Sequence, residues 1–124
     1  MKSVTVKKFP GKTKRYVRCL KLRDDAALVN EYKLRHSKEK IWKEILDGIK
    51  EVGILEMEIF LNGTDLVMIM EVPEDFNWDA SMERLATLPR QQEWENYMSE
   101  FQQADAGATA DAKWHTMDRI FHLY

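Results

Sequence analysis

Two apolar segments on either side of a short turn sequence constrain the fold of this chain more than any other feature. The segments 54–61 (ILEMEIFL) and 66–72 (LVMIMEV) are separated by Asn-Gly-Thr-Asp at positions 62–65. Residues of these types form tight turns, and apolar strands around such a turn are typical of a β-hairpin. Pro73 has no N–H group to donate to a sheet, so we expect the second strand to end there.

Extended and helical patterns precede the hairpin. Residues 15–22 alternate and predict a strand, with Arg18 on the same face as the leucines of this segment. Apolar residues then recur at helical spacing over 24–36 and again over 41–52. The pair Asp24-Asp25 is suited to cap the first of these helices, because its carboxylates accept hydrogen bonds from the free N–H groups of a first turn.

Similar patterns follow the hairpin. Residues 78–101 carry large apolar side chains at helical spacing and predict two helices, interrupted at Pro89. Residues 104–112 are small and polar, so we expect a loop there. The last segment, 113–124, alternates again and predicts a final strand.

This order of elements predicts an α+β fold. A βαββαβ pattern closes as a four-stranded antiparallel sheet with its helices on one face. The hairpin strands also carry side chains that are too apolar to leave in water on either face of the sheet, namely Ile59, Leu61, Met68 and Met70. We therefore expect a homodimer in which two copies pack sheet on sheet.

Length, charge and cysteine count exclude several classes of protein. The 124 residues fit one domain, which we place at 15–124 after a flexible arm over 1–14. The net charge of -2 argues against nucleic-acid binding, and the single cysteine, Cys19, excludes an intrachain disulfide and a multi-thiolate metal site. No segment approaches the roughly 18 apolar residues of a membrane span or forms a signal peptide, so we expect a cytoplasmic protein without membrane contact.

Tyr32 and His36 are the first candidates for chemistry. They lie four residues apart in a predicted helix and therefore share one of its faces. An imidazole can move a proton near neutral pH while a phenol holds a polar ligand, although such a pair taken alone is more often a half-buried helix face. Trp94, between two glutamates, is suited to one wall of a polar pocket, although a single tryptophan is more often core. The three histidines are too scattered for a metal site.

Several segments together carry a family pattern: Tyr32-x-x-x-His36, Ile41-Trp42, the hairpin MEIFL and DLVMIMEV, QEWENYM, and IFHL near the C-terminus. From Tyr16 to Leu123 the chain resembles the L-rhamnose mutarotase family. The resemblance implies a dimeric α+β barrel of ferredoxin-like protomers. It also implies interconversion of the α and β anomers of a 6-deoxy-L-hexose, without cofactor or metal.

The resemblance also implies roles for particular residues. His36 matches the family's proton donor, Tyr32 its substrate-binding tyrosine, and Trp94 the first of two adjacent sugar-binding tryptophans, while the nearby Trp42 is a further expected substrate-binding residue. Two expected binding positions depart from the family, because Met57 replaces a tyrosine and Glu95 replaces the second tryptophan. The variant hairpin resembles the branch associated with L-fucose, so the resemblance favours L-fucose over L-rhamnose.

The residue that removes the proton from the anomeric hydroxyl is left open by the sequence. Glu58, Glu71, Glu95 and a bound water are the candidates. Two other functions also fit this fold class: a cofactor-independent monooxygenase, and a non-catalytic dimer that binds a sugar or a protein partner, because a fold does not decide a function.

Overall fold

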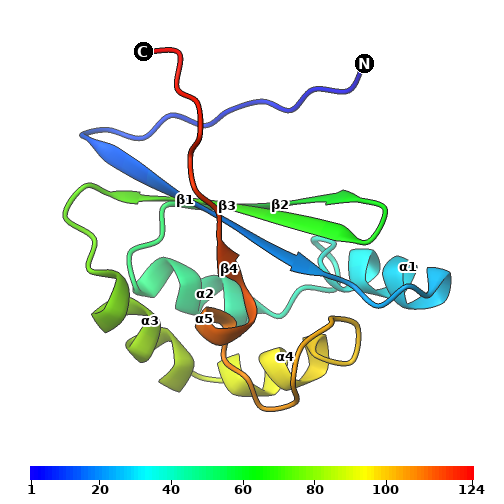
Figure 1. The fold of residues 1–124 in the computed structure, drawn as a ribbon. Helices are drawn as coiled ribbons and strands as arrows, with labels where there is room; N and C mark the ends of the chain where they lie inside the picture. The colour runs from blue at the N-terminus through cyan, green and yellow to red at the C-terminus, as the bar shows by residue number, and fades with distance from the viewer.

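The computed structural model describes all 124 residues and contains one four-stranded antiparallel sheet, with strand order β2-β3-β1-β4. The helices gather on one side of this sheet (Figure 1). The predicted α+β class, strand order along the chain and antiparallel sheet are therefore confirmed. The elements are β1 (Thr13–Lys21), α1 (Ala26–Arg35), α2 (Lys43–Glu51), β2 (Glu56–Asn62), β3 (Asp65–Pro73), α3 (Trp78–Thr87), α4 (Gln91–Met98), α5 (Ala110–Lys113) and β4 (His115–Thr116).

The β2–β3 hairpin forms as its sequence predicts. Asn62 pairs with Asp65, so the loop itself is Gly63-Thr64. Gly63 has φ +63, a value that glycine adopts without steric cost and that the first position of a tight hairpin loop requires. The strand β3 ends at Pro73 and pairs with both β1 and β2, which makes it the central support of the sheet.

The helices begin and end where local chemistry favours it. The Asp25 carboxylate accepts a hydrogen bond from the Leu28 N–H, and it caps α1. Val52 is the C-cap residue of α2, and Gly53 follows it with φ +95, a left-handed conformation that is common after helix C-termini. The predicted break near Pro89 is also confirmed, because α3 ends at Thr87 and α4 begins at Gln91 after Arg90 takes a left-handed conformation.

The two faces of the sheet differ in composition. The face toward the helices carries most of the buried strand residues, including Leu20, Leu66, Met68, Met70 and Val72. Ile59 and Leu61 alternate onto this same inner side of β2 and pack against the core. The sequence predicted a second apolar face from Ile59, Leu61, Met68 and Met70. All four instead lie on the inner face, where the helices already cover them. The outer face instead carries half-buried and exposed side chains, with Val17, Cys19, Phe60, Val67 and Ile69 among charged neighbours.

The C-terminal segment corrects one prediction. Only His115 and Thr116 pair with β1. The Met117 N–H still donates to the Val17 carbonyl oxygen, and residues 118–124 are exposed and leave the sheet (Figure 1). An alternating apolar pattern forms a strand only where it has a surface to cover, and a single copy of the chain offers this segment none. The predicted loop over 104–112 is also too long, because α5 begins at Ala110 and is capped by the Thr109 side chain.

The N-terminal boundary is also earlier than expected. Strand β1 begins at Thr13, so the last two residues of the expected arm belong to the sheet, whereas residues 1–8 are exposed.

None of the helices has the length and apolar character that crossing a membrane would need.

Candidate active site

A cavity of about 560 Å³ lies between the inner face of the sheet and the helices. Of its 25 lining residues, 17 are hydrophobic. Exposed side chains at its rim include Lys38, Leu46 and Lys50, so the cavity opens between the turn after α1 and the helix α2. Cavities of roughly 300–1,000 Å³ with a few convergent polar groups are typical of small-molecule sites.

Tyr32 and His36 form one end of this cavity. Their ring centroids are 4.3 Å apart, and His36 Nδ1 lies 2.7 Å from the carbonyl oxygen of Tyr32. Because a carbonyl oxygen only accepts hydrogen bonds, Nδ1 carries a proton and Nε2 is the nitrogen left for proton exchange. Burial lowers the pKa of His36 below its ordinary value, with the bond to the Tyr32 carbonyl opposing this effect.

The Tyr32 hydroxyl is fixed as a neutral phenol. The side chain is only 3% exposed, and Gln102 Nε2 donates a hydrogen bond to its oxygen at 3.2 Å. Burial raises the pKa of Tyr32 far above its ordinary value, and the nearby charge of Glu95 raises it further. The hydroxyl proton therefore stays in place at physiological pH and can be donated as a hydrogen bond to a polar ligand.

Trp94 forms the aromatic wall beside this pair. Its ring meets the His36 ring edge-on, with centroids 5.4 Å apart. On its other side Trp42 packs against it at 5.0 Å, and the Arg90 guanidinium lies 3.9 Å from the Trp42 ring centroid. Trp42 does not line the cavity, so the structure places it behind Trp94 as a support, instead of at the position expected for a substrate-binding residue.

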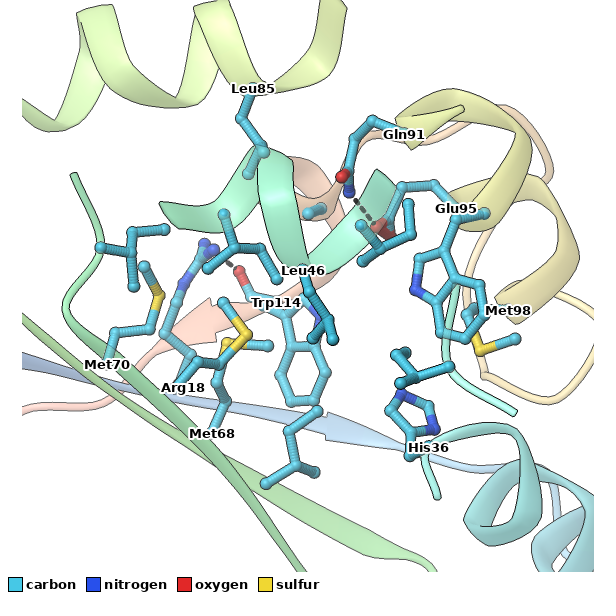
Figure 2. A pocket seen from close by; sticks show the side chains of 18 of the residues that line it. Arg18, His36, Leu46, Met68, Met70, Leu85, Gln91, Glu95, Met98 and Trp114 are labelled. Atoms are coloured by element: carbon cyan, nitrogen blue, oxygen red, sulfur yellow. Dashed lines mark hydrogen bonds between the residues drawn. The ribbon is translucent and has the colours of Figure 1, made fainter. Parts of the chain in front are cut away.

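Glu95 is a buried carboxylate at the same end, only 7% exposed. Lys113 Nζ lies 3.2 Å from Oε1 of Glu95 and donates to the Glu95 carbonyl oxygen at 2.5 Å. Gln91 Nε2 donates to Oε2 of Glu95 at 2.9 Å (Figure 2). Burial raises the pKa of Glu95, and the Lys113 charge opposes this rise. Desolvation conversely lowers the pKa of Lys113, which the carboxylate opposes. Taking both charges out of water costs free energy that their attraction need not recover, so the pair is not expected to stabilise the fold much. Buried titratable groups with shifted pKa values are instead typical of functional sites.

The other end of the cavity is apolar. Figure 2 shows Met68 and Met70 on one side and His36 and Met98 on the other, with Trp114 between them. Met82 and Leu85 of α3 complete the apolar end. Flexible thioether side chains pack readily around irregular apolar groups, so this end is suited to an apolar part of a ligand.

Arg18 is the exception at the apolar end. Its Nη2 donates to the carbonyl oxygens of Asp111 and Trp114, and its Nε is buried without a hydrogen-bond partner. The guanidinium also lies 4.9 Å from the Trp78 ring centroid. A charged residue on the leucine face of the predicted strand was the signal in the sequence that this position is unusual.

The structure brings most of the predicted site residues together. Tyr32, His36, Met57, Trp94 and Glu95 all line the one cavity. Two candidates for the base are excluded, because Glu58 and Glu71 alternate onto the outer face of the sheet, where the Glu71 carboxylate accepts from Thr13 and pairs with Arg15. Nowhere do three His, Cys, Asp or Glu side chains converge as a metal site would require.

Sequence reasoning missed several polar residues of the site: Arg18, Gln91, Gln102 and Lys113, together with the aromatic Trp114. Gln91 had a usable signal, because it lies four residues before Glu95 on the same helix face. Lys113 had none, because it reaches Glu95 from a one-turn helix inside a segment of small polar residues.

Comparisons with known proteins show the family to which the chain belongs. The model of the L-rhamnose mutarotase family matches residues 15–123. An L-fucose mutarotase of Xanthomonas campestris is 42% identical over 104 residues, which cover 84% of this chain and 83% of the relative. An L-rhamnose mutarotase of Enterococcus faecalis is 34% identical over 77 residues, which cover 60% of this chain and 69% of the relative.

A solved structure extends the likeness to the fold. The crystal structure of an L-rhamnose mutarotase from Formosa agariphila matches with a TM-score of 0.66 at 20% identity, covering 90% of this chain and 99% of that one. This match confirms the ferredoxin-like α+β protomer that the resemblance implied. The family model covers nearly the whole domain, and the chain belongs to the L-rhamnose mutarotase family of isomerases.

Proposed function

We propose that the chain interconverts the α and β anomers of a 6-deoxy-L-hexose, with L-fucose preferred over L-rhamnose. The observation that carries this proposal is the placement of His36. One ring nitrogen is bonded to the Tyr32 carbonyl, the other is left for a ligand, and Trp94 stands beside the ring inside a cavity of suitable size. Family membership supplies the reaction class.

The reaction needs two proton transfers. To open the ring, an acid gives a proton to the ring oxygen while a base removes the proton of the anomeric hydroxyl, and the aldehyde then recloses to either anomer. His36, protonated at Nε2, is placed to act as the acid. Tyr32 donates a hydrogen bond to a sugar hydroxyl, and the Trp94 ring stacks on the apolar face of the sugar.

The preference for L-fucose rests on the cavity wall and on a relative. Met57 and Glu95 line the cavity at the positions where the resemblance places a tyrosine and a tryptophan in L-rhamnose enzymes. A carboxylate accepts hydrogen bonds from sugar hydroxyls that an indole face can only stack against. The relative that matches at 42% identity is an L-fucose mutarotase. The apolar end of the cavity suits the methyl group that distinguishes a 6-deoxyhexose from an ordinary hexose.

Anomer exchange measured by saturation-transfer NMR tests the proposal directly. We expect the protein to accelerate exchange of L-fucose most and of L-rhamnose less, without any added cofactor. Exchange that is faster for L-rhamnose would contradict the substrate preference alone. A protein that binds either sugar without accelerating exchange is a sugar-binding module, and oxygen consumption in the presence of aromatic substrates would indicate a monooxygenase instead.

We also propose that the protein is a homodimer. The outer face of the sheet presents Val17, Phe60, Val67 and Ile69, and the exposed C-terminal segment adds Ile120, Phe121 and Leu123, which are 97%, 77% and 73% exposed. Exposed apolar side chains on a sheet face and on a nearby chain end are features that an interface would cover. Light scattering at micromolar concentration is expected to give twice the mass of one chain, and a stable, well-folded monomer would contradict the proposal.

A further inference from the structure

The base of the proposed reaction can be sought among the carboxylates that reach the cavity. Only two glutamates line it, Glu56 and Glu95. Glu56 stands at the first residue of β2 opposite Glu71, so strand alternation directs its side chain to the outer face, and its Oε1 accepts a hydrogen bond from the neighbouring Met57 N–H. Glu95 is buried, and it lines the same cavity as Tyr32, His36 and Trp94.

The surroundings of Glu95 hold the carboxylate in one orientation. Oε1 accepts from Lys113 and Oε2 from Gln91, so both oxygens are fixed by one donor each. A carboxylate has about four acceptor positions, so lone pairs remain for a ligand. Lys113 itself does not line the cavity and has no exposed side-chain surface, so it touches Glu95 from behind.

We propose that Glu95 is the catalytic base of anomer exchange, with Lys113 and Gln91 as its positioning residues. The inference rests on the proposed function. Trp94 and Glu95 of α4 both line the cavity, so a sugar held against the indole occupies the same space that the carboxylate reaches. His36 approaches the same sugar from α1, and the two proton-transferring groups therefore come from different helices at one end of the cavity.

The proton balance closes with a single shared proton. In ring opening the protonated His36 Nε2 gives its proton to the ring oxygen, the bond from the anomeric carbon to the ring oxygen breaks, and Glu95 takes the proton of the anomeric hydroxyl. The products are the open-chain aldehyde, a neutral imidazole and a neutral carboxylic acid. In reclosure Glu95 returns its proton to the aldehyde oxygen while His36 removes the proton of the attacking hydroxyl, which restores both groups.

The electrostatics suit such an exchange. Desolvation lowers the pKa of His36 and raises that of Glu95, so the two pKa values move toward each other, which suits an acid and a base that exchange protons with the same sugar. The charge of Lys113 from α5 opposes the rise in the pKa of Glu95 and so favours the ionised carboxylate that a base requires. The remaining charged and titratable groups that line the cavity are Tyr32, Arg18 on β1, and Lys38, Lys50 and Glu56 toward its rim.

Glu95→Gln tests the base directly, because the amide keeps the size and an acceptor oxygen but takes no proton. We expect exchange of L-fucose to fall by about a hundred- to ten-thousandfold while saturation-transfer contacts to bound sugar persist. Glu100→Gln is the matched control, an exposed glutamate just after α4 that makes no ion pair, and it should exchange at the wild-type rate. A wild-type rate in Glu95→Gln would overturn the inference and leave the proposed function intact, whereas a wild-type protein without activity would overturn the proposed function.

The pH profile separates the positioning role of Lys113 from a merely structural one. Wild-type kcat/KM should be bell-shaped, since one proton must be shared by the pair. Lys113→Met removes the charge that lowers the pKa of Glu95, so the acid-side inflection should move to higher pH. An unmoved inflection would overturn the role of Lys113. Should either variant fail to fold, Glu95→Asp retracts the carboxylate by one methylene, and the inference predicts a lower kcat with KM little changed. An unchanged kcat would contradict it.

Discussion

The two ends of the cavity are built from different parts of the fold and serve different purposes. The polar end takes Tyr32, Glu95 and Gln102 from α1, α4 and the turn after α4. The apolar end takes Met68 and Met70 from β3 and further apolar side chains from α3. The sheet therefore supplies shape and apolar surface, whereas the helices and the turns between them supply most of the hydrogen-bonding groups, including those to which we assign proton transfer.

Each end also holds one buried cation, and the two cations differ in what they face. Lys113 is directed at a carboxylate that lines the cavity. Arg18 is directed at the carbonyl oxygens of Asp111 and Trp114 and at the Asp111 carboxylate, 3.4 Å away, whose side chain is largely exposed. A buried charge is retained where it is paired. In the proposed mechanism the first pair positions the base, whereas the second pair ties the α5 segment to β1.

The largest expected effect comes from removing the imidazole at the polar end. His36→Ala should keep the fold, because His36 is only half-buried at the end of α1, and should lose about a hundred- to ten-thousandfold in anomer exchange. Saturation-transfer NMR on L-fucose measures the rate, and circular dichroism checks the fold. His115→Ala, at an exposed histidine of β4, is the control. Unchanged exchange in His36→Ala with sugar still bound would remove His36 from the acid role.

The apolar end should govern the choice between a methyl and a hydroxymethyl group. L-Galactose differs from L-fucose only by a hydroxyl on C6, and an apolar pocket rejects an added hydroxyl by about a hundredfold. We expect kcat/KM for L-galactose to be lower by about that factor. Met68→Gln offers that hydroxyl a partner and should narrow the difference. Equal rates for the two sugars in the wild type would show that C6 does not lie at the apolar end.

The regular elements were predictable because each is determined by neighbouring residues. Alternation and turn chemistry fixed the β2–β3 hairpin, and the aspartate cap and Pro89 fixed helix boundaries. The C-terminal strand was wrong beyond Thr116 because alternation reports only that a segment has two faces. A strand forms only if one of those faces can pack on another part of the fold or on a partner. The residues of the segment itself do not reveal whether such a surface exists.

The site was predictable to the extent that its residues share one helix or carry the family pattern. Tyr32 and His36 are one turn apart, and Trp94 and Glu95 are adjacent. Lys113, Gln102 and Arg18 come from distant segments and meet these residues only through tertiary packing. Trp42 was expected to bind substrate because the Ile41-Trp42 segment belongs to the family pattern, whereas in the structure its ring packs against Trp94 and does not line the cavity.

A smaller effect is expected at Met57, which lines the cavity from β2 opposite Met70 of β3. Met57→Tyr restores the hydroxyl that the resemblance assigns to L-rhamnose enzymes, and it leaves His36 and Glu95 untouched. We expect the ratio of kcat/KM for L-fucose over L-rhamnose to fall by up to about tenfold, the range of one neutral hydrogen bond. Parallel NMR exchange assays on both sugars measure the ratio. A ratio that rises would show that this wall does not distinguish the two sugars in the expected sense.

The smallest expected effect concerns stability and tests whether the polar end is as dry as its packing implies. Burial lowers the pKa of His36 in the folded protein, whereas the unfolded chain keeps an ordinary value of about 6.5. As the pH falls through 6.5, the unfolded state binds the proton first, so this histidine's contribution to stability is present above that pH and is lost toward the lower folded-state pKa. The test compares urea unfolding of the wild type and of His36→Gln at about pH 8 and about pH 5.5, on either side of the unfolded-state pKa. The wild type should lose more stability on acidification than the variant. His115→Gln should follow the wild type, because that side chain is exposed. If the wild type and His36→Gln lost equal unfolding free energy on acidification, water would have to reach the imidazole in the folded protein. The two ends of the cavity would then differ in the side chains that line them and not in how well they exclude water.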